Sequence, residues 1–397
     1  GTDEFDDLYT RYESDGRIPK KTIKAQALIL DILKERAETG RLYIMNIDHC
    51  NSHSSFIDKV NMSNLCQEIT LPTDPIGHID DASGEIALCV LSAVNVGKLK
   101  NLDELEELCD LSVRGLEELI DYQKYPILAA ELATKARRSL GVGFIGLAHY
   151  LAKLGFNYAD QAAWDAVHGL SESFQYYLLK SSNQIAKEKG ACSAFPRTKY
   201  ADGILPIDTY KSDVDEISSQ EYERDWESLR VSILEHGLRH STLSAQMPSE
   251  SSSVVSNATN GIEPPRGYLS IKKSKKGPLK QIVPQYTTLK NNYTLLWDMP
   301  DNTGYINVVS VMQKFFDQAI SGNWSYNPEH YTDSEIPVSV MAGDLLKTYK
   351  YGWKTSYYQN TYDLKTDEVS DDKMDKLESL LSELDTADEE DCESCKI

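Results

Sequence analysis

Asn64, Cys66 and Glu68 combine, within one short segment, three side-chain types that can do acid–base and redox chemistry. If the segment is extended, the two-residue period of a strand places all three on one face, pointing into one pocket. An amide can orient a substrate hydroxyl, a carboxylate can accept its proton, and a thiol between them can do redox or nucleophilic work. Taken alone, the triplet is better explained as a buried cysteine next to surface polar residues, and other features along the chain reverse that preference.

A second thiol and a hydroxyl-rich turn are the next candidates. Cys89 lies in the apolar run 86–91, which is typical of a buried strand. A turn that opens a helix offers free backbone N–H groups and hydroxyls that can hold a phosphate, although an ordinary helix cap explains it as well. The residues of this turn are Pro248, Ser249, Glu250, Ser251 and Ser252.

Tyrosines and cysteines near the C-terminus complete the set. Tyr357 and Tyr358 lie in a segment of strand character and should face opposite sides if it is extended. From Leu364 onward the chain is acidic with few aromatic residues, which predicts a flexible tail. Cys392 and Cys395 lie in that tail without the second cysteine pair that zinc requires, so a mobile dithiol that exchanges with another disulfide is favoured.

Three other patterns receive structural interpretations. The segment 48–53 contains an acid, two histidines and Cys50, but it lacks a second paired ligand set, so we predict no metal there. The glycine-rich segment 141–146 follows a helix rather than a strand, which favours close packing over a dinucleotide site. Cys109 and Cys192 are expected to be structural.

Hydrophobic periodicity and turn residues predict the elements that must position these groups. Helices are expected over 20–38, 103–122, 129–138, 160–189, 225–236, 304–320 and 337–350. Strands are expected over 42–46, 86–91, 241–245 and 354–361, with a basic-tipped hairpin over 268–283.

Composition limits the class of protein. The 397 residues are 41% hydrophobic, enough for a substantial core, and the net charge of −21 argues against a general nucleic-acid surface. Seven unevenly spaced cysteines do not form the framework of a secreted domain, and no apolar run reaches the length of a membrane span. We therefore predict a soluble cytoplasmic protein that binds neither DNA, RNA nor membrane.

The triplet, Cys89, the turn 248–252, the tyrosine pair and the terminal dithiol resemble, in order and spacing, the large (α) subunit of class Ia ribonucleoside-diphosphate reductase of the enterobacterial and large-phage type. The loop 257–267 agrees as well. The resemblance implies an α/β fold: a ten-stranded α/β barrel, of which residues 1–363 supply the finger loop near 64–68 and the second half-barrel. Residues 364–397 correspond to the flexible redox tail.

The resemblance also implies a role for each candidate. Cys66 corresponds to the thiyl-radical site, Glu68 to the base for the 3′ hydroxyl, and Asn64 to the amide that orients substrate hydroxyls. Cys89 corresponds to one member of the redox pair, and residues 248–252 to the loop that cradles the substrate diphosphate. Tyr357 and Tyr358 correspond to the radical relay, and Cys392 and Cys395 to the dithiol that restores the active site.

The expected function is reduction of ribonucleoside diphosphates to 2′-deoxyribonucleoside diphosphates. The implied partners are the N-terminal half of the large subunit, which this sequence lacks, the small (β) subunit with its di-iron centre and tyrosyl radical, and thioredoxin or glutaredoxin. No cofactor is expected on this chain, and the cysteine partner of Cys89 belongs to the missing half. The alternative is a non-catalytic assembly or regulatory fragment, and a stand-alone dithiol oxidoreductase leaves most motifs unexplained.

Overall fold

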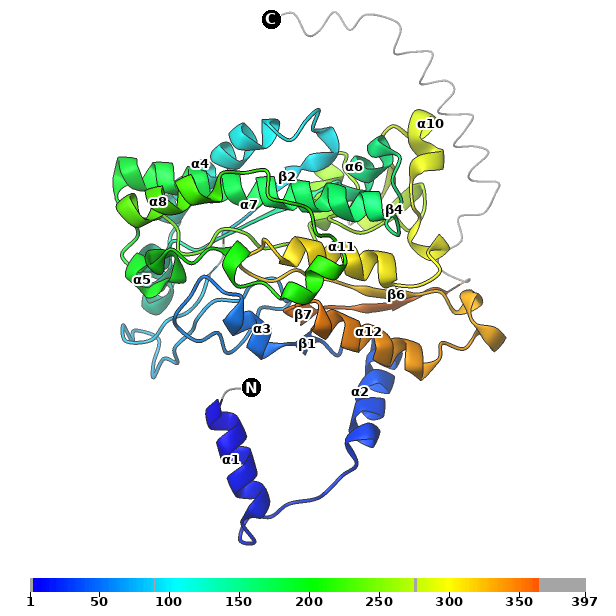
Figure 1. Ribbon diagram of the computed structural model, residues 1–397, viewed down its shortest axis with the longest axis horizontal. Helices are drawn as coiled ribbons and strands as arrows, with labels where there is room; N and C mark the ends of the chain where they lie inside the picture. The colour runs from blue at the N-terminus through cyan, green and yellow to red at the C-terminus, as the bar shows by residue number, and fades with distance from the viewer. Residues whose placement is uncertain (1–2, 89, 275–276, 364–397) are drawn as a thin grey trace, which may run out of the picture.

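The structure is a computed structural model that describes residues 3–88, 90–274 and 277–363. Cys89, Cys392, Cys395 and the predicted tail lie outside these residues. The fold is mixed α/β, with helices packed around short strands (Figure 1).

The helices are α1 (Asp3–Ser14), α2 (Ala25–Thr39), α3 (Ile47–Ser52), α4 (Glu104–Tyr122), α5 (Leu128–Arg137), α6 (Leu147–Leu154), α7 (Gln161–Lys189), α8 (Trp226–His236), α9 (Glu250–Val255), α10 (Tyr286–Leu289), α11 (Thr303–Gln313) and α12 (Val338–Lys350). Local signals set several ends. Gly40 stops α2 in the left-handed conformation, and its N–H donates to the Arg36 carbonyl. The Asp225 side chain accepts a hydrogen bond from the Ser228 N–H and so caps α8.

The strands are β1 (Ile44–Met45), β2 (Val90–Asn95), β3 (Leu140–Ile145), β4 (Leu269–Ser274), β5 (Gly277–Ile282), β6 (Trp324–Tyr326), β7 (Thr355–Ser356) and β8 (Gln359–Thr361). β2 pairs parallel with β3, β6 pairs parallel with β8, and β1 pairs antiparallel with β7. The antiparallel pair β4 and β5 confirms the predicted hairpin.

Extended segments between these strands join them into one open series. Val142 in β3 bridges Ser244, and Gln246 bridges Ile320, both in parallel orientation. The order is therefore β2, β3, the segment 242–246, the segment 318–326 that contains β6, and β8. Within the described residues this series does not close into a barrel, and β2 has no hydrogen-bonded strand on its other edge.

Aromatic packing of β3 against α7 and the segment that follows α11 anchors the core. Phe144 of β3 contacts Phe174 of α7 and Phe316, with ring centroids 5.3 and 5.8 Å apart. β3 is buried along its whole length, and a Cβ on Gly143 would lie 2.7 Å from the Ala245 carbonyl oxygen. The glycine-rich segment therefore serves close packing, as predicted.

Several predicted boundaries are wrong. The strand placed at 86–91 begins at Val90 and continues to Asn95, and the helix placed at 304–320 ends at Gln313. The segment 241–245 forms isolated bridges rather than a regular strand. The strand at 354–361 is interrupted at Tyr357 and Tyr358, which separate β7 from β8.

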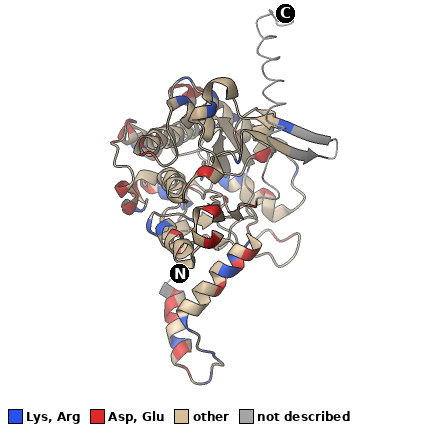
Figure 2. Ribbon diagram, turned by 90° about the vertical axis from the view of Figure 1, so that its right-hand side faces the viewer, with Lys and Arg blue, Asp and Glu red and all other residues tan. Residues whose placement is uncertain are grey.

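Helices α1 and α2 extend away from the rest of the molecule (Figure 1), and acidic and basic residues mix along both (Figure 2). Exposed apolar side chains also lie on this arm, among them Leu28, Ile29 and Leu30. No helix in the described parts of the chain is long and apolar enough to cross a membrane.

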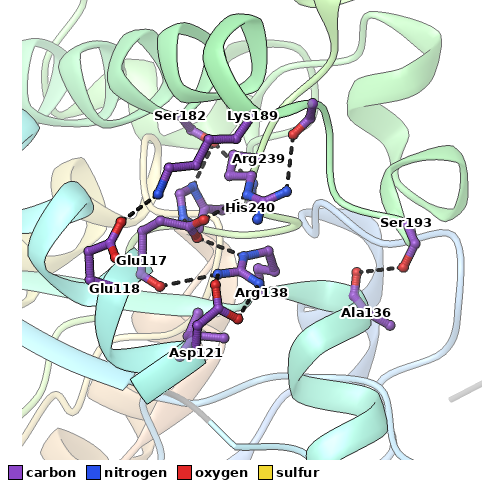
Figure 3. Close-up of polar contacts among 12 residues, drawn as sticks. Glu117, Glu118, Asp121, Ala136, Arg138, Ser182, Lys189, Ser193, Arg239 and His240 are labelled. Atoms are coloured by element: carbon purple, nitrogen blue, oxygen red, sulfur yellow. Dashed lines mark hydrogen bonds and ion pairs between the residues drawn. The ribbon is translucent and has the colours of Figure 1, made fainter. Parts of the chain in front are cut away.

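A buried carboxylate ties α4 to the segments that flank β3. Glu117 is 1% exposed and accepts hydrogen bonds from Arg138 and Arg239, each at 2.7 Å, and from His240 at 3.1 Å (Figure 3). Burial alone would raise the pKa of Glu117, but the donors His240, Arg138 and Arg239 outweigh it and hold that pKa well below 4.5.

We expect Glu117→Gln to lower the free energy of unfolding by about 3 kcal/mol, because it removes the buried charge that Arg138, Arg239 and His240 share and leaves Arg138 with Asp121 alone. The lowered pKa makes the stabilisation by Glu117 complete above the unfolded value of 4.5 and weaker as the pH falls below it. Urea denaturation at pH 7 and at pH 4 measures both effects. Glu118→Gln, which changes an exposed carboxylate, is the control. Equal losses of unfolding free energy in the two variants would contradict the stabilising role of the buried Glu117.

Candidate active site

The segment that carries Asn64, Cys66 and Glu68 is a turn rather than the extended chain considered above. Gln67 adopts a left-handed conformation with φ of 69°, and its N–H donates to the Asn64 carbonyl at 3.2 Å. This reversal overrides the two-residue alternation of a strand. The turn nevertheless brings the Asn64 side chain to Glu68, where it acts to lower the pKa of that carboxyl group.

Contacts from distant segments hold this turn in place. The Ser321 hydroxyl donates to the Cys66 carbonyl at 2.6 Å, and the Ala319 N–H donates to the Glu68 carbonyl at 3.0 Å. The Thr355 hydroxyl donates to the Gln67 carbonyl at 2.9 Å. The position of the thiol therefore depends on the chain near 320 and on β7.

The Cys66 thiol and the Tyr357 hydroxyl meet at the wall of a cavity of about 730 Å³. The distance between Tyr357 Oη and Cys66 Sγ is 3.5 Å. Both residues belong to the cavity lining, as does Ser321. Three parts of the chain that are far apart in sequence therefore meet at one thiol.

The tyrosine pair lies side by side, not on opposite faces. The ring centroids of Tyr357 and Tyr358 are 4.0 Å apart, because the chain leaves the strand conformation between β7 and β8. Burial, followed by hydrogen bonds to Cys66 and Tyr358, raises the pKa of Tyr357. Hydrogen bonds from Tyr357 and Tyr43 lower the pKa of Tyr358.

Tyr43 is a member of this cluster that the sequence analysis missed. Its ring centroid is 4.8 Å from that of Tyr357 and 5.4 Å from that of Tyr358. It lies directly before β1, which pairs with β7, and that pairing brings it to the tyrosines. The predicted strand at 42–46 contained Tyr43, but only the strand pairing shows which tyrosines it meets.

Replacing Tyr43 with phenylalanine is expected to raise the pKa of Tyr358, because a donor that favours its phenolate is lost. The pKa can be followed by NMR of a ¹³C-labelled tyrosine at position 358. Tyr349→Phe serves as the control, since its hydroxyl contacts Asp48 instead. An unchanged Tyr358 titration in Tyr43→Phe would show that this hydrogen bond is not formed.

The surroundings of Glu68 shift its pKa in the direction that suits a group acting as an acid or base. Its side chain is 2% exposed, and the Ser321 hydroxyl lies 3.3 Å from its carboxylate. Burial raises the pKa of Glu68, while hydrogen bonds from Asn64 and Ser321 act in the opposite direction. A carboxyl group of this kind can exchange a proton nearer to neutral pH than an exposed one.

The hydroxyl-rich turn does open a helix, the six-residue α9. Ser249 has a left-handed conformation with φ of 55° at its start. Pro248 and Glu250 line the cavity that contains Cys66, whereas Ser251 and Ser252 are exposed and lie outside its lining. The structure thus brings part of the turn to the thiol, together with the loop 258–268.

The histidines and thiol near α3 point to separate partners. His49 Nδ1 lies 2.9 Å from the Trp353 carbonyl, and His53 contacts the Thr209 hydroxyl and the Gln313 carbonyl. Among the described residues no three His, Cys, Asp or Glu side chains are grouped to hold a metal ion. Burial raises the pKa of Cys50 to about 12, which leaves it a packing residue.

Cys109 and Cys192 are likewise buried, and burial raises the pKa of Cys192 to about 11. Both agree with the structural roles expected for them. Of the thiols in the described residues, only Cys66 lines the cavity.

Comparison with known proteins gives a consistent result. Residues 1–359 match the family model described as ribonucleotide reductase, barrel domain. The chain is 57% identical over 372 residues to ribonucleoside-diphosphate reductase subunit alpha of Haemophilus influenzae, covering 93% of this chain and 49% of the relative. Identity is 53% over 372 residues with ribonucleoside-diphosphate reductase 1 subunit alpha of Escherichia coli, covering 93% of this chain and 49% of the relative.

The corresponding protein of Enterobacteria phage T4 is 41% identical over 368 residues, covering 91% of this chain and 48% of the relative. The chain therefore spans about half the length of the curated relatives it matches. The family match and these relatives agree with the cluster of Cys66, Glu68 and the tyrosines, and they show that the chain belongs to the barrel-domain family of ribonucleotide reductase alpha subunits.

Proposed function

We propose that this chain is the catalytic C-terminal half of a ribonucleoside-diphosphate reductase large subunit, which reduces ribonucleoside diphosphates to 2′-deoxyribonucleoside diphosphates. The observation that carries the proposal is the 3.5 Å contact between the Cys66 thiol and the Tyr357 hydroxyl at a cavity large enough for a nucleotide. A tyrosine in hydrogen-bond contact can take the hydrogen atom of the thiol once it is itself oxidised.

The proposed chemistry uses the three residues of the turn in succession. The Cys66 thiyl radical removes the 3′ hydrogen atom of the ribose, and Glu68 takes the proton of the 3′ hydroxyl. Asn64, whose amide contacts Glu68, orients the hydroxyls of the substrate. The 2′ hydroxyl then takes a proton from the pair of thiols described below and leaves as water, and Cys66 returns the hydrogen atom to the 3′ carbon at the end.

The two electrons of the reduction come from a pair of thiols that becomes a disulfide. Cys89 is proposed as one of them, with its partner on the half of the subunit that this sequence lacks. Cys392 and Cys395 would then reduce that disulfide by thiol exchange and be reduced in turn by thioredoxin or glutaredoxin. The residues 248–252 are proposed to hold the diphosphate at the mouth of the cavity, where Pro248 and Glu250 lie.

Two protein partners are required in this scheme. The oxidising equivalent comes from the small subunit, with its di-iron centre and tyrosyl radical, and reaches Cys66 through Tyr358 and Tyr357. The remainder of the large subunit is proposed to cover the open edge of β2, where Leu91 is 43% exposed. An uncovered strand edge with apolar neighbours favours pairing with another segment.

The test is reduction of a ribonucleoside diphosphate by this chain and the small subunit, with and without a polypeptide that matches the other half of the relatives. Product formation only in the complete mixture supports a site completed across the two halves. Full activity of the chain with the small subunit alone would contradict the need for the other half. Assembly without activity in any mixture would contradict the catalytic role.

The raised pKa of Glu68 predicts the acid side of the pH profile. Since the base must be ionised, kcat/KM should fall as the pH decreases through a value above the ordinary 4.5 of a glutamate. Glu68→Gln should lower kcat by about 10²–10⁴-fold and remove this limb. Steady-state rates between pH 5 and 8 measure both effects, and an unchanged acid limb in the variant would assign it to another group.

A further inference from the structure

The loop Glu263–Arg266 lies beside the tyrosine pair and has no role in the scheme above. It is held at both ends, because the Tyr158 hydroxyl donates to the Ile262 carbonyl at 2.8 Å and the Leu296 N–H donates to the Pro265 carbonyl at 2.9 Å. Its two central residues are prolines, whose rings fix φ and limit backbone motion. The loop is therefore a stiff support for whatever its end residues contact.

Glu263, at one end of the loop, is connected to the backbone of the tyrosine pair through the side-chain amide of Asn323. The Asn323 Nδ2 donates to the Glu263 carboxylate, and the Asn323 Oδ1 accepts from the Tyr358 N–H at 2.9 Å. The neighbours of Asn323 complete the contact, since the Tyr357 N–H donates to the Gly322 carbonyl at 2.8 Å. Both tyrosines are thus hydrogen-bonded through their backbone to the segment that Glu263 contacts.

Arg266 at the other end reaches the same strand beyond the tyrosines. Its Nη2 donates to the Asn360 Oδ1 at 3.2 Å, and its guanidinium lies 5.5 Å from the centre of the Trp297 ring. The positive charge of Arg266 also acts on Glu263. The loop is therefore linked to Tyr358 through Asn323 and to β8 through Asn360.

We propose that the loop Glu263–Arg266 is a bracket that fixes the tyrosine pair against Cys66, and that Glu263 is a positioning residue for the transfer between Tyr357 and Cys66. The proposal deepens the proposed function and rests on it. It concerns how the relay is held rather than which groups react.

The carboxylate matters because the amide of Asn323 has two different ends. An acceptor facing Nδ2 fixes the amide with Oδ1 towards the Tyr358 N–H. Without that acceptor the Asn323 amide loses one of these two hydrogen bonds, and its side chain can move away from the Tyr358 N–H. The backbone at Tyr358 then loses its hydrogen bond, and a displacement of about 1 Å at a reacting pair can cost 10²-fold in rate.

The experiment compares Glu263→Ala, Glu263→Gln and Asn323→Ala in the complete complex of both halves and the small subunit. Glu263→Ala and Asn323→Ala should each lower kcat by about 10–100-fold with KM changed less than about twofold, and combining them should cost little more than either alone. Glu263→Gln keeps an acceptor for Asn323 and should retain most of kcat. A lowered kcat at constant KM separates positioning from substrate binding.

Asp344→Ala is the matched control for loss of a buried carboxylate. Asp344 accepts from Asn302 and Tyr326 and has no hydrogen bond to the tyrosine pair among the contacts of the described chain, so this variant should keep kcat even if it loses stability. A raised KM with normal kcat in Glu263→Ala would place Glu263 on the substrate instead and overturn the proposal. So would an unchanged kcat.

A crystal structure of the Glu263→Ala chain tests the bracket independently of activity. A Tyr357 Oη–Cys66 Sγ distance longer than the 3.5 Å seen here, with a displaced Asn323 side chain, would support the bracket even if the complete complex showed no reductase activity. In that case the proposed function alone would fail. An unmoved tyrosine pair in the variant would overturn the bracket while leaving the proposed function intact.

Discussion

Replacing Cys66 with serine is expected to lower ribonucleoside-diphosphate reduction by about a thousandfold or more, the scale of losing a group that reacts in the chemical step. A serine O–H bond is too strong for an oxidised tyrosine to break, so the radical would stop at Tyr357. Binding of the small subunit and of substrate should persist, because the Cys66 carbonyl, not its thiol, accepts the Ser321 hydrogen bond. Product formation and subunit binding are measured on the same preparation.

Cys50→Ser provides the comparison for this variant. Cys50 is a buried thiol on α3 that does not line the cavity, so its replacement should leave turnover per folded molecule near normal. Assembly without turnover in Cys66→Ser would also separate a catalytic chain from a non-catalytic assembly fragment, which has no need of the thiol. Appreciable turnover in the Cys66→Ser variant would exclude Cys66 as the radical site.

The elements that the sequence predicts well are those encoded by local signals. α4, α7, α8 and α12 begin and end within a residue or two of the expected positions, because an amphipathic period and capping residues such as Asp225 and Gly190 lie in the helix sequence itself. The hairpin of β4 and β5 follows for the same reason. Asn64, Cys66 and Glu68 could be chosen as candidates by residue type, whereas the extended conformation assumed for them was wrong.

The conformations that place the site could not be predicted, because distant contacts decide them. Gln67 takes a positive φ within a turn held by Ser321 and Thr355, and neither residue carries a local sign of that role. The tyrosine pair leaves the strand where Gly322 and Asn323 bind its backbone. Local strand propensity therefore predicted opposite faces where the fold places the rings together.

The short segment 319–323 explains how the two parts of the site stay in register. It donates to the Glu68 carbonyl through Ala319, to the Cys66 carbonyl through Ser321, and it accepts from the Tyr357 N–H at Gly322. The thiol and the tyrosine pair are thus both attached to one stretch of backbone, in addition to the direct contact between the Tyr357 hydroxyl and the Cys66 sulfur. A shift of either side relative to this segment changes the distance between Tyr357 and Cys66 directly.

Tyr357→Phe is expected to reduce turnover by about a thousandfold or more with little change in KM, as for a group that acts only in the chemical step. Phenylalanine keeps the ring contacts with Tyr43 and Tyr358 but lacks the hydroxyl that lies 3.5 Å from the Cys66 sulfur. The fold should be retained, because this hydroxyl has no other hydrogen-bond partner outside the site among the described residues.

Tyr349→Phe is the control for removing a tyrosine hydroxyl from this half of the chain, since its hydroxyl contacts Asp48 away from the cavity. It should leave both kcat and KM unchanged. Equal binding of substrate to both variants, measured by calorimetry, would place the loss in Tyr357→Phe at the radical step. If Tyr357→Phe kept more than about a tenth of the normal kcat, Tyr357 could not be the residue that oxidises Cys66, because a thousandfold loss is expected for a group essential to the chemical step.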